Sequence, residues 1–515
     1  MAAEPSPARA GAVALAPRVP GATYRLQLHQ GFTFDDARRL VPYLDALGVT
    51  DLYASPYLRA RPGSSHGYDI VDHSALNPEI GTEADHAALC AALEARGMGQ
   101  ILDVVPNHMG ISHGQNRWWR DVLENGPGAA YADFFDIDWD PVKRELANRV
   151  LLPILADQYG QVLESGELVL TLEGGGFQVR YHDLVLPISP ESATDILAYR
   201  LDALAGTLAE GHPDLLEYQS ILTGLRNLPA RTETAPERVA ERTREAEVLR
   251  RRLARLLEES EPVRLSVEET VRVLNGKRGD PRSFDLLDRL LDRQVYRLAY
   301  WRVAADEVNY RRFFDINELA ALRMERPAVF RETHRLILRL VEEGKVTGLR
   351  VDHPDGLHDP ARYFLALQQA RLEQLSAVGG SSPAFEGGPD RERTGVEGTL
   401  VASPAGDVPA AAGVWPLYVL AEKVLGRGER MPTRWAIHGT TGYEFLATVG
   451  GLFVDPAGAR PLTATYRAFT GLRTPYPDVV YASKQLILDV ALSSELAVLG
   501  RASGSATRGT SPCGG

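Results

Sequence analysis

Short apolar runs of strand length recur along the chain and alternate with longer amphipathic stretches. The short runs are rich in Val, Leu and Ile and end in charged or turn residues, which is typical of buried parallel strands. They predict strands at residues 23–28, 49–55, 100–105, 347–351, 417–421 and about 434–438. Apolar residues at helical spacing predict intervening helices such as 34–47 and 83–96. This alternation predicts an α/β fold, a (β/α)8 TIM-type barrel that is incomplete, with about six strands present.

Two insertions interrupt the alternation. Residues 107–189 carry short alternating runs such as 176–180, which predict a small β-rich inserted domain. Residues 190–324 are helical in pattern, with leucines at helical spacing among many Arg and Glu residues, as at Leu249 and Leu253. We interpret those charges as a solvated helix face and not as a binding patch.

The barrel is expected to occupy the two segments that flank these insertions. Its first part covers residues 20–106 and its continuation covers residues 325–499. Within the continuation, residues 377–413 are rich in Gly, Pro, Ser and Ala and predict a disordered surface loop. Residues 500–515 lack apolar periodicity and have the composition of a non-native tail.

Charge and cysteine content narrow the function classes. The chain has 515 residues, with 56 Lys and Arg against 68 Asp and Glu, so the net charge is −12. This acidic balance argues against a nucleic-acid partner and fits a neutral sugar polymer better. Cys90 and Cys513 are too few and too far apart for a disulfide framework, and neither has metal-ligand spacing around it. We expect no metal, no cofactor, no membrane span, and a cytoplasmic location.

Three of the predicted strands end in residues with catalytic potential. Asp352, Glu422 and His108 each follow an apolar run, which is how a parallel barrel presents functional groups at one rim. A pair of carboxyl groups suits glycosidic bond cleavage, in which one attacks the anomeric carbon and the other protonates the departing oxygen. For any single run, however, a solvated charge at a strand end is the more frequent explanation.

The roles within this pair follow from the neighbouring residues. Arg350 lies two residues before Asp352, on the same strand face, so its charge is expected to keep Asp352 ionised as the nucleophile. Glu422 follows an apolar run, and partial burial is expected to raise its pKa toward that of a general acid. The adjacent Lys423 would oppose this effect on the pKa of Glu422.

Taken together, these runs resemble the conserved regions of the α-amylase clan of glycoside hydrolases. Residues 103–108, 348–353 and the strand that ends at Glu422 resemble the first, second and third regions in that order. More specific resemblances point to the family of maltooligosyltrehalose synthases, over about residues 20–499. They lie in the segments 23–28, 64–69, 350–357, 422–425 and 438–445.

The resemblance implies a role for each matching residue. Asp352 matches the nucleophile, Glu422 the acid/base, and Arg350 the arginine that braces the nucleophile. It also implies substrate-binding residues and residues that organise the rim. The former are Tyr68, Asp69, His108 and His353, and the latter are Asp103 and Asn107.

The implied reaction is an intramolecular transglycosylation. A retaining double displacement would convert the reducing-end α-1,4 linkage of a maltooligosaccharide or linear α-1,4-glucan into an α,α-1,1 (trehalose) linkage. Because water competes with the freed glucose as the acceptor, the site must retain the glucose and exclude water. The resemblance also implies a functional partner, a trehalose-releasing hydrolase of the same clan. Aromatic residues such as Trp118, Trp119 and the pair Phe134 and Phe135 could stack on sugars, although a core role is at least as plausible.

The chain also departs from the family pattern. Family members are longer, and a His-Asp pair that supplies their third carboxylate has no match after Glu422. We therefore expect a C-terminal truncation, a barrel with two open edges and little turnover. Three hypotheses remain: a synthase only partly represented, an α-glucan hydrolase of the same clan, or an inactive fragment that at most binds glucan.

Overall fold

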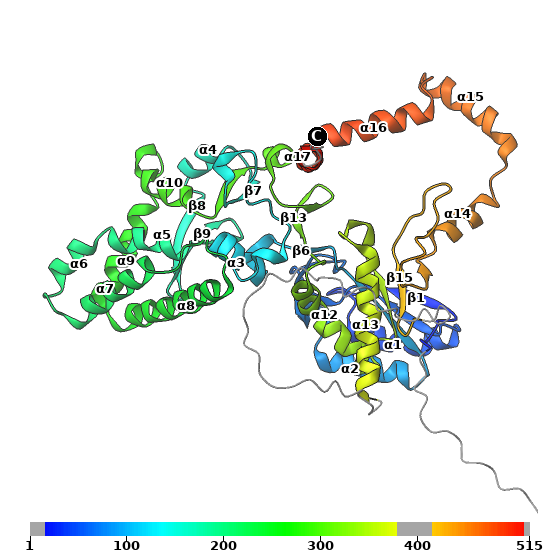
Figure 1. Cartoon of the computed structure of the whole chain (residues 1–515), viewed down its shortest axis with the longest axis horizontal. Helices are drawn as coiled ribbons and strands as arrows, with labels where there is room; N and C mark the ends of the chain where they lie inside the picture. The colour runs from blue at the N-terminus through cyan, green and yellow to red at the C-terminus, as the bar shows by residue number, and fades with distance from the viewer. Residues whose placement is uncertain (1–15, 379–414, 509–515) are drawn as a thin grey trace, which may run out of the picture. The chain divides into compact units, whose positions relative to one another are not determined.

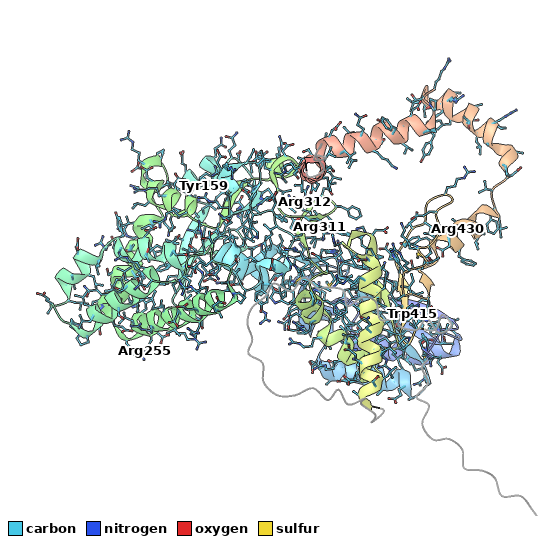
Figure 2. The ribbon with its side chains drawn as sticks, in the orientation of Figure 1. Tyr159, Arg255, Arg311, Arg312, Trp415 and Arg430 are labelled. Atoms are coloured by element: carbon cyan, nitrogen blue, oxygen red, sulfur yellow. The ribbon has the colours of Figure 1, made fainter. Side chains whose placement is uncertain are left out.

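The computed structural model describes residues 16–378 and 415–508 (Figures 1 and 2). Contacts between residues divide the chain into two compact units. The first unit contains Met1–Met109 and Leu322–Gly458, and the second contains Gly110–Ala321 and Ala459–Gly515. Residues 459–499, which were predicted to be part of the barrel, fall in the second of these units.

A six-stranded sheet forms the centre of the first unit. Every pair of neighbouring strands in it is parallel. In spatial order its strands are β1 (Thr23–Leu26), β2 (Asp51–Ala54), β5 (Gly99–Val104), β14 (Gly348–Val351), β15 (Tyr418–Ala421) and β16 (Gly439–Thr440). The predicted barrel-type sheet and its number of strands, six, are confirmed.

The last strand lies later in the chain than the sequence suggested. Residues 434–438 were predicted as a strand, but β16 is only Gly439–Thr440. Trp435 donates its N–H to the carbonyl of Pro432, so the segment before the strand turns instead of extending. The backbone joins the sheet only at His438, whose N–H bonds the Val419 carbonyl.

Amphipathic helices accompany the sheet in sequence and pack with it (Figure 1). Helices α1 (Phe34–Ala46) and α2 (Glu83–Glu94) both begin with a capping box, in which a Thr and an Asp satisfy the free N–H groups of the first turn. Their buried faces include Phe34 and Leu89, both 0% exposed. Helices α12 (Pro327–Glu342) and α13 (Pro360–Val378) complete the helical part of this unit before the segment that is not described.

The second unit combines the strands and helices of both predicted insertions. Among its strands, β8 (Leu168–Glu173), β9 (Gly176–Tyr181) and β10 (Leu184–Pro187) form an antiparallel sheet. Strands β7 (Val150–Leu155) and β11 (Tyr296–Tyr300) form a parallel pair. Between residues 110 and 321 its longer helices are α3 (Arg117–Asn125), α5 (Pro190–Ala198), α7 (Pro213–Arg226), α8 (Pro236–Glu259) and α9 (Glu261–Leu274).

Two expectations about side chains in this unit are now decided. The aromatic residues considered for sugar stacking are core residues, since Trp118, Trp119, Phe134 and Phe135 are all buried and pack edge to face. The charged face of α8 is not wholly solvated, because Arg242 is only 1% exposed. Its guanidinium bonds Glu191, and this pairing offsets the cost of burying the charge.

Residues 459–508 are helical. They form α15 (Ala459–Thr470), α16 (Tyr476–Val490) and α17 (Ser493–Arg508), so part of the predicted tail at 500–515 is helix. Within the second unit, α17 is anchored by Glu495, which pairs with Arg312 at 2.8 Å. The predicted loop at 377–413 lies mostly outside the described residues. In the ranges that are described, no helix is both long and apolar enough to span a bilayer.

Candidate active site

Asp352 and Glu422 follow the carboxyl ends of two neighbouring strands. Strands β14 and β15 pair in parallel, with Val351 opposite Ala421. The sheet hydrogen bonds continue one residue further, because the Asp352 N–H donates to the Val104 carbonyl and the Glu422 N–H to the Val351 carbonyl. Both backbones are therefore fixed at the same edge of the sheet, where sequence analysis expected both side chains.

Arg350 joins these carboxylates to a third one. Its Nη1 lies 2.7 Å from Asp352 Oδ1 and 2.6 Å from Asp103 Oδ1, and its Nη2 lies 3.7 Å from Glu422 Oε2. The Arg350 side chain is only 8% exposed, so its charge acts with little screening by water. Burial alone would lower the pKa of Arg350, but Asp103 and Asp352 outweigh this effect and hold the pKa above its usual range.

Asp103 is held by two tyrosines as well as by Arg350. Tyr68 donates its hydroxyl to Asp103 Oδ2 at 2.7 Å, and Tyr53 donates to the same oxygen at 3.0 Å. Burial raises the pKa of Asp103 although these bonds and Arg350 favour its charged form. With its oxygens engaged in this way, Asp103 is suited to fix its neighbours in place, which is the role expected for it.

Burial also governs the charge of Asp352. It raises the pKa of Asp352 to about 6, and the opposing effect of Arg350 does not cancel this rise. Asp103 and Glu422, which are also acidic, push the pKa in the same upward direction. The expectation that Arg350 keeps Asp352 ionised therefore holds only above this pKa, because desolvation is larger than sequence spacing could indicate.

Glu422 is held by the backbone of the loop after β14. His353 adopts the left-handed conformation, with φ 43° and ψ 54°, and its N–H donates to Glu422 Oε2 at 3.0 Å. Gly356 follows closely, and a Cβ there would lie 2.5 Å from both Asn107 Oδ1 and His353 Cδ2. Close packing around residue 356 therefore requires glycine there. Residue 353 takes a positive φ, which is uncommon for a residue other than glycine.

The opposite end of the Glu422 side chain is open to solvent. This side chain is 24% exposed, and Oε1 lies 3.5 Å from the Tyr443 hydroxyl. Lys423, which could have opposed a raised pKa of Glu422, instead pairs with Asp355 at 3.1 Å and Glu429 at 3.0 Å. The role of Glu422 as a general acid stays a prediction.

The remaining predicted residues lie deeper in the same unit. Asp69 is 5% exposed, accepts a hydrogen bond from Ser64 Oγ at 2.5 Å and pairs with Arg61 at 3.3 Å. His108 is 1% exposed, and its Nε2 lies 3.2 Å from the Tyr68 carbonyl oxygen. Direct contact of Asp69 and His108 with a sugar stays a prediction, whereas their contacts show how each side chain is fixed.

Sequence reasoning assigned no role to three residues that complete this arrangement. Tyr53 donates to Asp103, Arg25 donates to the Tyr68 hydroxyl at 3.1 Å, and Tyr443 lies beside Glu422. A signal existed for two of them, because Arg25 and Tyr443 lie in segments noted for their family resemblance. The strand pattern also held a signal for Tyr53. Side chains alternate along a strand, so Tyr53 lies on the same face as the polar Asp51 and opposite to the apolar Leu52 and Ala54.

Comparison with known proteins decides the family. The model of the alpha amylase catalytic domain matches residues 38–160. A curated relative from Mycobacterium tuberculosis (strain ATCC 25618 / H37Rv), named as a maltooligosyl trehalose synthase, is 32% identical over 449 residues, or 86% of this chain. The chain belongs to the maltooligosyltrehalose synthase family. The match covers 40% of that relative, so the chain spans well under half of its length.

Solved structures of the maltooligosyltrehalose synthase family agree. The enzyme from Arthrobacter ramosus aligns with a TM-score of 0.61 and 32% identity, over 94% of this chain and 45% of that chain. A Sulfolobus tokodaii structure described as a hypothetical maltooligosyl trehalose synthase gives a TM-score of 0.58 and 26% identity, over 94% of this chain and 46% of that chain. The similarity thus extends over most of this chain.

Proposed function

We propose that the site converts the reducing-end α-1,4 linkage of maltooligosaccharides to an α,α-1,1 linkage by a retaining double displacement. The observation that carries this proposal is the contact of one buried guanidinium, that of Arg350, with both Asp352 and Glu422. Two carboxyl groups that share one cation at one sheet edge can flank a single glycosidic bond. The family of the chain supports the same reaction.

In the first step, Asp352 attacks the anomeric carbon at the reducing-end linkage. The glycosidic C–O bond breaks, a bond from the sugar to the Asp352 carboxylate forms, and Glu422 gives its proton to the departing glucose oxygen. Arg350 orients Asp352 through the 2.7 Å contact. Asp103 in turn fixes Arg350, because Tyr53 and Tyr68 hold the second oxygen of Asp103 in place.

In the second step, the freed glucose is the acceptor. Its anomeric hydroxyl loses a proton to Glu422 and attacks the glycosyl carbon, which displaces Asp352 and forms the trehalose linkage. Water competes for the same carbon, so the glucose must be held while the intermediate lasts. We assign this retention to Tyr68, Asp69, His108 and His353, with Asn107 organising the loop around them. The product would feed a hydrolase of the same clan that releases trehalose.

Incubation of the chain with maltopentaose tests this proposal. The expected product is non-reducing and shows the anomeric proton signals of an α,α-1,1 linkage by NMR, together with loss of reducing ends. Asp352→Asn should abolish its formation, whereas Asp355→Asn is the matched control, because Asp355 contacts Lys423 and none of the three clustered acids. Release of glucose and shorter maltooligosaccharides without the non-reducing product would establish hydrolysis instead, and no reaction at all would contradict the proposal for this chain.

Substrates with different leaving groups should distinguish the role of Asp352 from that of Glu422. Glu422→Gln removes the proton donor, so turnover should fall most with substrates whose leaving group is a poor one, and much less with an activated aryl glycoside. Asp352→Asn should remove activity with both substrates, since no covalent intermediate can form. Equal loss with both substrates in Glu422→Gln would contradict the assignment of Glu422 as the acid.

A further inference from the structure

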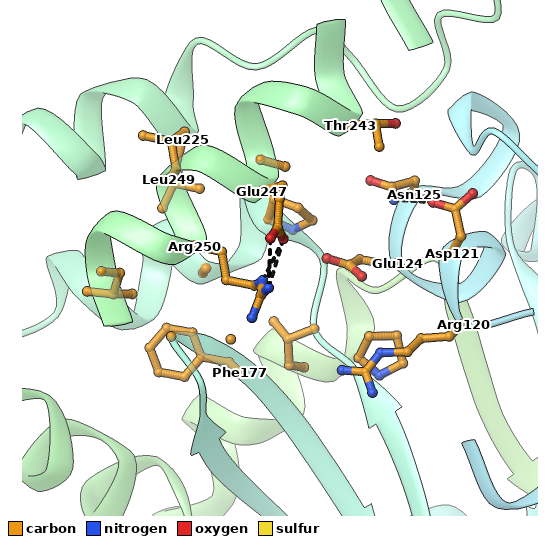
Figure 3. Close-up of a pocket in the computed structure, with 18 of the residues that line it drawn as sticks. Arg120, Asp121, Glu124, Asn125, Phe177, Leu225, Thr243, Glu247, Leu249 and Arg250 are labelled. Atoms are coloured by element: carbon orange, nitrogen blue, oxygen red, sulfur yellow. Dashed lines mark hydrogen bonds and ion pairs between the residues drawn. The ribbon is translucent and has the colours of Figure 1, made fainter. Parts of the chain in front are cut away.

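The second unit contains a cavity that is separate from the proposed catalytic site. Its volume is about 510 Å³, within the range of small-molecule sites, which is roughly 300–1,000 Å³. Helices α3, α5, α7 and α8, the turn between β8 and β9 and the end of β10 form its walls (Figure 3). All its lining residues belong to the second unit.

Glu124 on α3 presents an unpaired carboxyl group to this cavity. Figure 3 shows its oxygens pointing into the space between α3 and α8. Among the described residues, no hydrogen bond or ion pair of its carboxyl group is found, while Asp121, one turn earlier, is bonded by Asn125 and the Tyr131 N–H. Burial raises the pKa of Glu124. The charge of Arg120 opposes this rise without making a hydrogen bond to the carboxyl group. A shielded carboxyl group without a hydrogen-bond donor is costly, so this position suits donors supplied by a ligand.

The opposite wall is preorganised by α8 and the β8–β9 turn. Arg250 is fixed by Glu247 at 2.8 Å and by the Gly174 carbonyl at 2.9 Å (Figure 3). At Gly175, φ is 75° and an added Cβ would lie 2.3 Å from the Arg250 carbonyl oxygen, so the turn packs directly on the helix. Phe177, which is 5% exposed, adds an apolar surface beside these polar groups.

The lining favours a neutral ligand with many hydroxyl groups. Carboxylates outnumber guanidinium groups in the cavity wall, which disfavours anions, and they can accept hydrogen bonds from several hydroxyls. The apolar C–H face of a sugar ring can pack on an aromatic or aliphatic surface. The charged lining residues are Arg120, Asp121, Glu124, Glu173, Glu247 and Arg250.

We propose that this cavity is a second saccharide site, which binds a short α-1,4-glucan through Glu124 and against the apolar wall that includes Phe177. The choice of α-1,4-glucan among sugars rests on the proposed function, whereas the cavity and its polarity do not. Occupation of such a site would hold a glucan on the second unit without taking part in bond cleavage. The site would therefore add binding free energy and leave the chemistry of Asp352 and Glu422 unchanged.

Carbodiimide labelling of carboxyl groups, mapped by peptide mass spectrometry, tests this proposal residue by residue. Maltotriose should slow the labelling of Glu124 at least fivefold in a saturable manner and leave Glu164 unchanged, because Glu164 is exposed and lies outside the cavity. Ala246→Trp should fill the cavity and abolish the protection. Val248→Trp on the same helix is the matched control, since Val248 is 45% exposed and does not line the cavity.

The same labelling reports separately on the two sites. Protection of Asp352 and Glu422 without protection of Glu124 would overturn the second site and leave the proposed function standing. Protection of Glu124 alone would support the second site and count against glucan binding at the catalytic residues. Protection of Glu124 by spermidine at lower concentration than maltotriose, or protection that survives Ala246→Trp, would overturn the assignment of a saccharide.

Discussion

The backbone N–H of His353 donates a hydrogen bond to Glu422 Oε2 at 3.0 Å, across the gap between two neighbouring strands. This bond is possible because His353 is left-handed, with φ 43°. A non-glycine residue in this conformation carries strain, which is commonly found where surrounding structure fixes a functional group. Here the strained residue orients one carboxyl group of the proposed pair while it directly follows the other one, Asp352.

Substitutions at His353 should separate strain from side-chain function. His353→Val should lower the free energy of unfolding by about 1–2 kcal/mol, because a β-branched residue resists positive φ, whereas His353→Gly should stay within about 1 kcal/mol of the parent. Thermal unfolding measures both. His358→Val is the control, since His358 is exposed and is not among the residues with positive φ. Equal destabilisation by Val at 353 and 358 would contradict the strain at His353.

The pH dependence of turnover should report on Asp352. Its pKa of about 6 means that the nucleophile is ionised above this pH and protonated below it, so kcat/KM should fall as pH drops through about 6. Arg350→Lys should move this acid limb to higher pH, because loss of the guanidinium contacts weakens the influence of Arg350, which favours the ionised form. A limb that stays in place in Arg350→Lys would show that another group controls it.

Tyr53→Phe should weaken the positioning of Arg350, although Tyr53 itself contacts only Asp103 in this chain of bonds. The change removes one hydrogen bond to Asp103 Oδ2 and leaves the ring, so unfolding should become easier by about 1–2 kcal/mol. The KM for maltooligosaccharides should change little, while kcat falls, because Tyr53 acts on Arg350 through Asp103. Tyr24→Phe is the control, as Tyr24 is 47% exposed. A Tyr53→Phe protein with unchanged stability and kcat would rule out this positioning role.

Stability should fall in mild acid because of His334. This residue is buried, its Nε2 lies 2.8 Å from the Tyr363 hydroxyl, and its Nδ1 lies 3.0 Å from the Phe330 carbonyl oxygen. Burial lowers its pKa to about 4 from the ordinary histidine value of 6.5. As pH falls, the unfolded chain binds a proton at this histidine before the folded chain does. The stabilisation by neutral His334 is therefore complete above pH 6.5 and is lost as pH falls toward 4. The free energy of unfolding should drop by about 2 kcal/mol between pH 7 and 5.

Urea unfolding at these two pH values measures this loss. His334→Leu removes the titrating group, so its stability should depend less on pH, even though it starts from a lower value. His358→Gln is the control, because His358 is exposed and should leave the pH dependence unchanged. The same slope in the parent and in His334→Leu would show that other groups, such as the buried His86, dominate the acid sensitivity.

Apolar strand patterns were sufficient to predict five of the six barrel strands and the placement of Asp352 and Glu422 beside each other. The pattern failed at 434–438, because a turn after Pro432 keeps the chain away from the sheet until His438. It also could not show how far desolvation raises the pKa of Asp352, since burial depends on packing across several strands. The cavity beside Glu124 was likewise beyond prediction, because α3 and α8 are far apart in sequence and meet only in the folded unit.

The strand order predicts which part of the central sheet should exchange its amide hydrogens most slowly. The three strands that carry Asp103, Arg350 and the approach to Glu422 are β5, β14 and β15, with β1 and β2 on one side and β16 on the other. Fraying begins at exposed edges, so amide hydrogen exchange should be slowest at Leu102, Leu349 and their neighbours and faster toward Thr23. The proposed catalytic groups are thus attached to the part of the sheet that should be the last to exchange.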